Sequence, residues 1–139
     1  GHYEFLVLAF GLTGGPNTFQ GSMNSDLAPV SKECAVVYFD DILVFSKTYL
    51  DHLKHLEQVL SILQEKQWKV KLSKCAFAQQ EIAFVGHVIS DKGVSTDSSK
   101  IVTIQEWPTP ANVKEARGFL GLSGYYRKFI RNYGIISKP

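Results

Sequence analysis

The sequence has 139 residues, of which 45% are hydrophobic, enough for a core in one domain or in one and a half. Lys and Arg number 15 against 13 Asp and Glu, so the chain as a whole is not strongly basic. Any binding of nucleic acid would therefore have to come from a local basic face. Cys34 and Cys75 are too far apart for a CxxC metal or redox pair, so we expect reduced thiols. No stretch approaches the roughly 20 apolar residues of a membrane helix.

The first half of the chain mixes predicted strands and helices. Hydrophobic periodicity predicts, in order, a strand over 5–10, a helix over 18–27, a hairpin over 35–45 and a helix over 49–66. The apolar stripe of the last helix is predicted to consist of Leu53, Leu56, Leu60 and Leu63, with Thr48 as its cap. His52 and His55 are expected at the surface, because no further Cys or His lies nearby in sequence to complete a metal site.

The second half changes from strands to helices. Strands are predicted over 70–77 and 82–89, and helices over 98–106 and from Asn112 onward. Asn112 and Glu115 have the spacing of a capping box, and Trp107-Pro108 ends the helix before it. The change near Ser95 predicts a boundary between residues 1–95 and 96–139. We expect an α+β fold in which an antiparallel sheet with packed helices precedes a helical segment.

An acidic pair lies inside the predicted hairpin. Asp40 and Asp41 are flanked by the apolar runs 36–37 and 42–44. Burying two adjacent carboxylates is costly unless a cation compensates their charge, and Mg²⁺ prefers a few carboxylates together with phosphate oxygens. The alternative is a solvated Asp-Asp turn that needs no metal. The pair is therefore the candidate metal and catalytic site.

The residues around the acids resemble a known family. Tyr38-Phe39-Asp40-Asp41 is similar to the Tyr-x-Asp-Asp motif of reverse transcriptases. Further blocks resemble the polyproteins of gypsy-class LTR retrotransposons in the same order along the chain: Phe10 to Gln20, Asp41 to Ser46, His52-Leu53, Leu72 to Phe77, Gly86 to Ser90, Gly118 to Leu122 and Tyr125 to Ile130. Several blocks in series are far more specific than any one of them. Leu8-Ala9 and Gly14-Gly15 depart from the family pattern.

The resemblance implies a catalytic role for the acidic hairpin. Two Mg²⁺ ions, or Mn²⁺, serve nucleotidyl transfer in such polymerases. Asp40 is implied as the main metal ligand and Asp41 as its support, with a third carboxylate upstream of this chain. Lys74 is implied as a proton donor to pyrophosphate, with a solvated lysine as the alternative. Residues implied to lie at the incoming nucleotide are Phe10, Gly11, Tyr38 and Phe39; Gly11 is equally well explained as a turn glycine.

The remaining motifs resemble parts that hold nucleic acid. Phe84-Val85-Gly86-His87 is similar to the primer grip, although an exposed sheet position explains His87 as well. Beyond Asn112 a single long helix is predicted, with basic side chains opposite an apolar face. These basic residues are Arg117, Arg127, Lys128 and Arg131. They are either a solvated face or contacts of a thumb helix with the template–primer backbone.

The resemblance thus implies an incomplete polymerase palm with catalytic hairpin and primer grip over 1–95, followed by the start of a helical thumb or connection over 96–139. The implied function is RNA-directed DNA polymerisation within a pol polyprotein. Its ligands would be an RNA or DNA template with primer and dNTP. Its protein partners would be the rest of the pol polyprotein, with fingers and palm upstream and RNase H and integrase downstream. No membrane partner is expected. The alternative is a non-catalytic remnant that binds nucleic acid or a protein. We expect an intracellular location, in a cytoplasmic particle or the nucleus, and an inactive fragment in isolation, because the first catalytic aspartate is missing.

Overall fold

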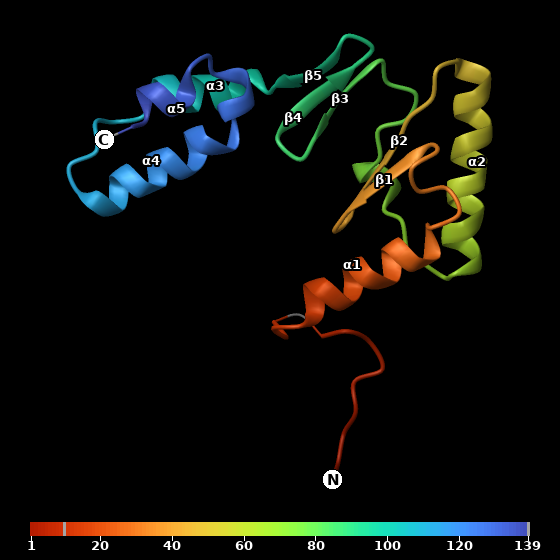
Figure 1. Cartoon of the computed structure of the whole chain (residues 1–139). Coiled ribbons are helices and arrows are strands. Elements are labelled where there is room, and N and C mark those ends of the chain that lie inside the picture. The colour runs from red at the N-terminus through yellow and green to blue at the C-terminus, as the bar shows by residue number, and fades with distance from the viewer. Residues whose placement is uncertain (10, 139) are drawn as a thin grey trace. The chain divides into compact units, whose positions relative to one another are not determined.

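The computed structural model describes residues 1–9 and 11–138, which form two compact units, Gly1–Ala78 and Gln79–Pro139 (Figure 1). The first unit contains α1 (Gly15–Asp26), β1 (Ala35–Tyr38), β2 (Asp41–Val44), α2 (Tyr49–Glu65) and the 3-10 turn η1 (Leu72–Lys74). The second contains β3 (Glu81–Phe84), β4 (His87–Ser90), β5 (Gly93–Thr96), α3 (Ser98–Gln105), α4 (Val113–Tyr125), η2 (Arg127–Phe129) and α5 (Tyr133–Ile136). The α+β class expected from the sequence is confirmed.

In the first unit, two helices pack on an antiparallel hairpin. Strand β1 pairs with β2, with Val36 opposite Leu43, and α1 contacts β1 while α2 contacts β2. An isolated hairpin is marginal in water, so this sheet depends on the two helices that cover it. The buried residues that join the four elements are Met23, Leu27, Val30, Cys34, Ala35, Val59 and Leu63. Burial, and then the charge of Glu33, raise the pKa of the Cys34 thiol.

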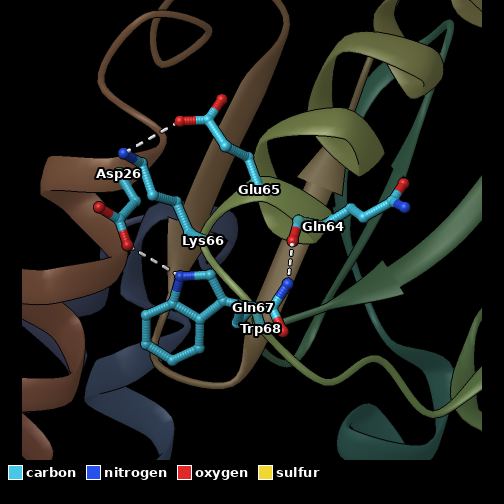
Figure 2. A network of polar contacts seen from close by, with 6 residues as sticks. All are labelled: Asp26, Gln64, Glu65, Lys66, Gln67 and Trp68. Carbon is cyan, nitrogen blue, oxygen red and sulfur yellow. Dashed lines mark hydrogen bonds and ion pairs between the residues drawn. The ribbon is translucent and has the colours of Figure 1, made fainter.

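A tryptophan joins the ends of α1 and α2. The indole N–H of Trp68 donates to the Asp26 carboxylate at 2.9 Å, and its ring packs edge-on against Phe19 with centroids 5.1 Å apart. Figure 2 shows this indole directed at Asp26, beside an ion pair between Lys66 and Glu65. Because Asp26 is the last residue of α1 and Trp68 follows α2, the bond fixes the two helix ends to each other.

Helix α2 begins as predicted, but its buried face differs. Thr48 caps it by accepting from the Asp51 N–H at 3.2 Å. Leu53 and Leu60 are 45% and 41% exposed, whereas Val59 and Leu63 are buried, so the predicted stripe is wrong in half of its members. Periodicity shows only that the helix has an apolar side, and packing on β2 selects which residues of that side are covered.

The second unit starts with a three-stranded antiparallel sheet in the order β3–β4–β5. The single strand predicted over 82–89 is in fact two strands joined at a turn, and β5 was not predicted. Helices α3 and α4 begin as expected. Asn112 accepts from the Glu115 N–H at 3.0 Å and Glu115 accepts from the Ala111 N–H at 2.8 Å, close to the predicted capping box. Asp97 caps α3, and hydrogen bonds from Ser99 lower the pKa of its carboxyl.

Three further predicted elements are wrong. Residues 5–9 form no strand, and Phe5 and Leu6 are 81% and 96% exposed. Residues 70–77 contain the 3-10 turn η1 in place of a strand. In both cases the apolar pattern was present, but a strand also needs a paired neighbour, which the described chain does not place there. The third error is the long last helix, because α4 ends at Tyr125 and η2 and α5 follow it.

The predicted division between residues 1–95 and 96–139 concerns functional subdomains and stays a prediction. Among residues 1–9 and 11–138, no helix combines the length and the apolar character required to cross a membrane.

The revised face of α2 is testable with two leucines three positions apart. We expect Leu63→Ala to lower the free energy of unfolding by about 2–5 kcal/mol, because it opens a cavity in the core. The matched control Leu60→Ala, at an exposed position, should cost less than about 1 kcal/mol. Urea denaturation of the 139-residue chain measures both. Equal losses would contradict the assignment of the buried face.

Candidate functional site

The acidic residues lie at the tip of the β1–β2 hairpin. Tyr38 pairs with Asp41 in the register, so Phe39 and Asp40 form a two-residue turn. Asp40 is on the turn as predicted, whereas Asp41 is the first residue of β2. Both carboxylates are exposed. The two carboxylates are therefore not buried, contrary to the expectation from the flanking apolar runs, and no cation is needed to offset their burial. The acids face solvent while apolar residues of the strands pack on the core.

The turn itself is held from α1. Phe39 has a φ of 48°, a left-handed conformation that is unfavourable for a side-chain-bearing residue. Its N–H donates to the Oε1 of Gln20, and the Nε2 of Gln20 donates to Asn24 Oδ1 at 2.8 Å. The bond to Asn24 orients the amide so that its oxygen faces the turn. Sequence reasoning missed this role of Gln20, although the residue belongs to one of the blocks that carry the resemblance.

The donor chemistry at this tip suits a hard divalent cation. Two exposed carboxylates on neighbouring residues offer oxygen ligands, with room for phosphate or water oxygens to complete a Mg²⁺ shell. In the part of the chain that the structure describes, no group of three or more His, Cys, Asp or Glu side chains gathers to hold a metal ion. Asp40 and Asp41 thus fit as part of a ligand set and require further ligands from outside it.

The predicted nucleotide and proton-donor residues are only partly brought to this tip. Phe10 lies outside the described residues. Gly11 is exposed with a φ of 89°, so its lack of a side chain serves a left-handed backbone. The Tyr38 and Phe39 rings meet edge-on at 5.0 Å beside the acids. Lys74 ends η1, is exposed, and forms no ion pair with either aspartate in the described chain.

The two histidines of α2 are not surface residues as expected. Ser46 Oγ lies 3.3 Å from His52 Nδ1 and 2.7 Å from His55 Nδ1, and all three residues are half-buried. The histidines lie next to the end of β2, because the face of α2 that packs on the hairpin differs from the predicted stripe in half of its members. One hydroxyl links both rings, which gives them a structural role in joining α2 to β2.

The predicted primer-grip residues form the tip of the β3–β4 hairpin in the second unit. Phe84 pairs with His87, which leaves Val85 and Gly86 as a two-residue turn with φ values of 48° and 74°. Positive φ at both residues is the pattern of a type I′ turn. The Tyr125 hydroxyl donates to Val85 O at 2.7 Å, and the Tyr126 hydroxyl donates to Gly86 O at 3.1 Å.

His87 lies among aromatic rings and not on an exposed sheet face. Its ring stacks on Tyr125 with centroids 5.3 Å apart and also meets Tyr126 and Phe129 at 5.6 and 5.7 Å. Its Nδ1 is buried and has no hydrogen-bond partner within the described residues. Burial, and then the proximity of Tyr125 and Asp97, raise the pKa of the Tyr126 hydroxyl.

The basic residues do not form one helical face. Arg117 belongs to α4, Arg127 and Lys128 to η2, and Arg131 follows η2. All four are exposed, as a contact with phosphates requires. The predicted face assumed a helix that continued through Tyr133, and it is lost because the helical geometry changes after Tyr125.

The two hairpins match the ordered motifs of a single family over most of the chain. Residues 1–89 match the family described as reverse transcriptase (RNA-dependent DNA polymerase). The chain belongs to the reverse transcriptase family.

Relatives of this reverse transcriptase chain are retrotransposon polyproteins. It is 43% identical over its whole length to the retrovirus-related Pol polyprotein from transposon 297 of Drosophila melanogaster, and 35% identical to that from transposon gypsy of the same fly. It is also 36% identical to the transposon Tf2-3 polyprotein of Schizosaccharomyces pombe. The chain spans 13%, 13% and 10% of these three polyproteins.

Solved structures agree with the sequence relatives. The foamy viral protease-reverse transcriptase in complex with double-stranded DNA is 33% identical with a TM-score of 0.80, covering 88% of this chain and 21% of that one. The same kind of protein in complex with an RNA/DNA hybrid is 32% identical with a TM-score of 0.73, covering 86% of this chain and 16% of that one.

The hydrogen bond from Phe39 to Gln20 predicts a measurable effect on the acidic turn. We expect Gln20→Ala to speed amide exchange at Phe39 about fivefold in the 139-residue chain, because such a bond contributes roughly 1 kcal/mol. The control Gln58→Ala, at an exposed glutamine of α2, should leave the rate unchanged. Exchange read by NMR distinguishes the two. A Phe39 rate that is the same in both variants would contradict the role of Gln20.

Proposed function

We propose that this chain forms part of the nucleotidyl-transfer centre of an RNA-directed DNA polymerase encoded by a gypsy-like retrotransposon. The observation that carries the proposal is the acidic tip, where Asp40 and Asp41 are exposed and adjacent and where Gln20 holds the turn that carries Asp40. Because the chain spans only 10–14% of its polyprotein relatives, the centre is completed by other parts of a pol polyprotein. A third carboxylate from such a part would complete the metal ligands.

In this proposal Asp40 is the main ligand of Mg²⁺ or Mn²⁺ and Asp41 supports it. Two such ions, when bound, activate the primer 3′-hydroxyl and neutralise the triphosphate with its leaving pyrophosphate. Asp40 and Asp41 contribute negative charge and oxygen ligands at a fixed place, and the Gln20 bond limits the movement of the turn that carries Asp40. Fixed ligands lower the cost of reorganisation during the reaction.

The incoming dNTP and the leaving group would meet residues of the same unit. Tyr38 and Phe39 carry rings beside the acids, which suits packing against a nucleotide. The exposed, side-chain-free backbone at Gly11 permits close approach of a ligand. Lys74 is exposed and is a candidate proton donor to pyrophosphate.

The second unit would hold the template and primer. The β3–β4 tip with Val85, Gly86 and His87 is the proposed primer grip. The exposed basic residues of α4 and η2 are proposed to contact the sugar-phosphate backbone, which attracts Lys and Arg without regard to sequence. Support comes from the foamy viral relatives, whose structures were solved in complex with double-stranded DNA and with an RNA/DNA hybrid.

The decisive experiment uses a reverse transcriptase that contains this chain, on a primed template. We expect Asp40→Asn to lower nucleotide incorporation by about 100-fold or more, since metal ligation contributes several kcal/mol to the transition state. The control Asp91→Asn removes the same charge at an exposed turn between β4 and β5 and should stay near wild type.

The same assay tests the isolated chain. The 139 residues alone should not extend a primer, because two carboxylates are an incomplete ligand set for two ions. Full activity of Asp40→Asn would contradict the proposed role, and an inactive wild-type enzyme that still binds duplex would favour a non-catalytic remnant.

The backbone contacts predict a change in salt dependence. Replacing Arg127 and Lys128 with Gln should reduce the slope of log affinity against log salt by roughly 1 for each residue, because each phosphate contact releases a counterion. Binding of the same enzyme to a primer–template duplex, titrated at several salt concentrations, measures the slope. The control Lys92→Gln, exposed in the β4–β5 turn, should not change it. A slope that is unaltered in the double variant would refute the contacts.

A further inference from the structure

Two neighbouring tyrosines bind two neighbouring carbonyls of the β3–β4 turn. Tyr125 reaches Val85 O and Tyr126 reaches Gly86 O, each across a sequence separation of 40 residues. Both bonds lie within the second unit. We call this pair of tyrosines with the turn the tyrosine clamp.

The clamp exists because α4 ends where it does. Consecutive residues of a continuous helix point about 100° apart and do not face one target. Tyr125 is the last residue of α4, and Tyr126 is its C-cap with φ −93° and ψ 10°. The rings then pack edge-on, 4.9 Å apart at 84°, which brings both hydroxyls to one turn. The end of α4 at Tyr125 thus places both tyrosine hydroxyls at the β3–β4 turn.

The clamp also restricts what the turn can do. A Cβ built on Gly86 would lie 2.9 Å from the Tyr126 hydroxyl oxygen, so the glycine leaves the space that this hydroxyl fills. Val85 is held at a positive φ that a β-branched residue rarely adopts. The His87 ring stacked on Tyr125 ties the start of β4 to the same pair. The turn cannot shift without loss of both hydrogen bonds and this stack.

The two hydroxyls also affect the charge that the turn presents to a nearby phosphate. Backbone carbonyl oxygens carry partial negative charge and repel phosphates at short range. Two of them on a turn that faces a primer strand would weaken its approach. Donation by Tyr125 and Tyr126 offsets part of the negative charge on both carbonyl oxygens. The turn then repels an anionic strand less strongly.

We propose that Tyr125 and Tyr126 are positioning residues that fix the β3–β4 turn against the primer end. The proposal rests on the proposed function of this turn as the primer grip. In this proposal the tyrosines act through Val85 and Gly86, whose carbonyl oxygens they bind. Loss of their hydroxyls should therefore slow nucleotide addition more than it weakens substrate binding.

The variants are chosen to keep the rings. The double variant Tyr125→Phe with Tyr126→Phe removes only the two hydroxyls of the clamp. The matched control is Tyr133→Phe in the same unit, whose hydroxyl bonds to Ser123 Oγ at 3.0 Å and Leu120 O at 3.3 Å, away from the turn. In the 139-residue chain, amide exchange at Gly86 and His87 should rise about 5- to 50-fold in the double variant, because two hydrogen bonds are lost, and should not rise in the control.

Function is then read in a reverse transcriptase that contains the chain. In single-nucleotide extension, kcat should fall about 10-fold in the double variant, with KM for dNTP within about twofold of wild type. Tyr133→Phe should extend normally at equal thermal stability. If exchange at the turn does not change, or if kcat in the double and control variants falls only in step with thermal stability, the positioning role is overturned.

A third measurement separates failure of this inference from failure of the proposed function. A photoreactive amino acid in place of Val85 should crosslink to the 3′ end of the primer in the assembled enzyme. A crosslink together with an unchanged kcat in the double variant overturns the clamp alone. No crosslink to the primer, with faster exchange in the double variant, overturns the primer contact and leaves the clamp as a structural feature only.

Discussion

Backbone strain at two hairpin tips is the constraint on which the rest of this chain depends. A side-chain-bearing residue at positive φ costs free energy and persists only where its surroundings fix it. Phe39 and Val85 both have a φ of 48°, one at the acidic tip and one at the β3–β4 tip. In each case side chains from a neighbouring helix bind the backbone of the turn, Gln20 at the first and the tyrosine pair at the second. The strained turns coincide with the positions where the proposed chemistry and primer contact take place.

The position of the acidic turn depends on the packing of the core beneath it. Gln20 reaches Phe39 because α1 packs on β1 through Met23 and Leu27, both nearly inaccessible to solvent. The bond between Trp68 and Asp26 then holds the far end of α1 to the end of α2. A two-stranded sheet has too little buried area to keep a fixed tip by itself. The position of the acidic pair therefore depends first on the hydrophobic packing of the helices.

Sequence patterns predicted local features well and long-range ones poorly. The Thr48 and Asn112 caps were predicted because a cap involves residues three positions apart. The acidic pair was predicted for the same reason, since covalent neighbours need no fold to meet. The strands expected over 5–10 and 70–77 failed because an apolar run does not specify a partner strand. The stripe of α2 failed because Leu60 and Leu63 are equally apolar and only contact with β2 distinguishes them.

The sequence by itself determined the family, the α+β class and the adjacent carboxylates at 40 and 41, because these follow from residue identity, order and short spacing. The tertiary structure alone decided that the acids are exposed, that Gln20 holds their turn from 19 residues away, and that two tyrosines reach carbonyls 40 residues distant. Hydrogen bonds over such separations form only after packing has brought the elements together. The end of α4 at Tyr125 illustrates the difference, since the helical pattern of the sequence continues past it while the helix itself ends there and η2 follows.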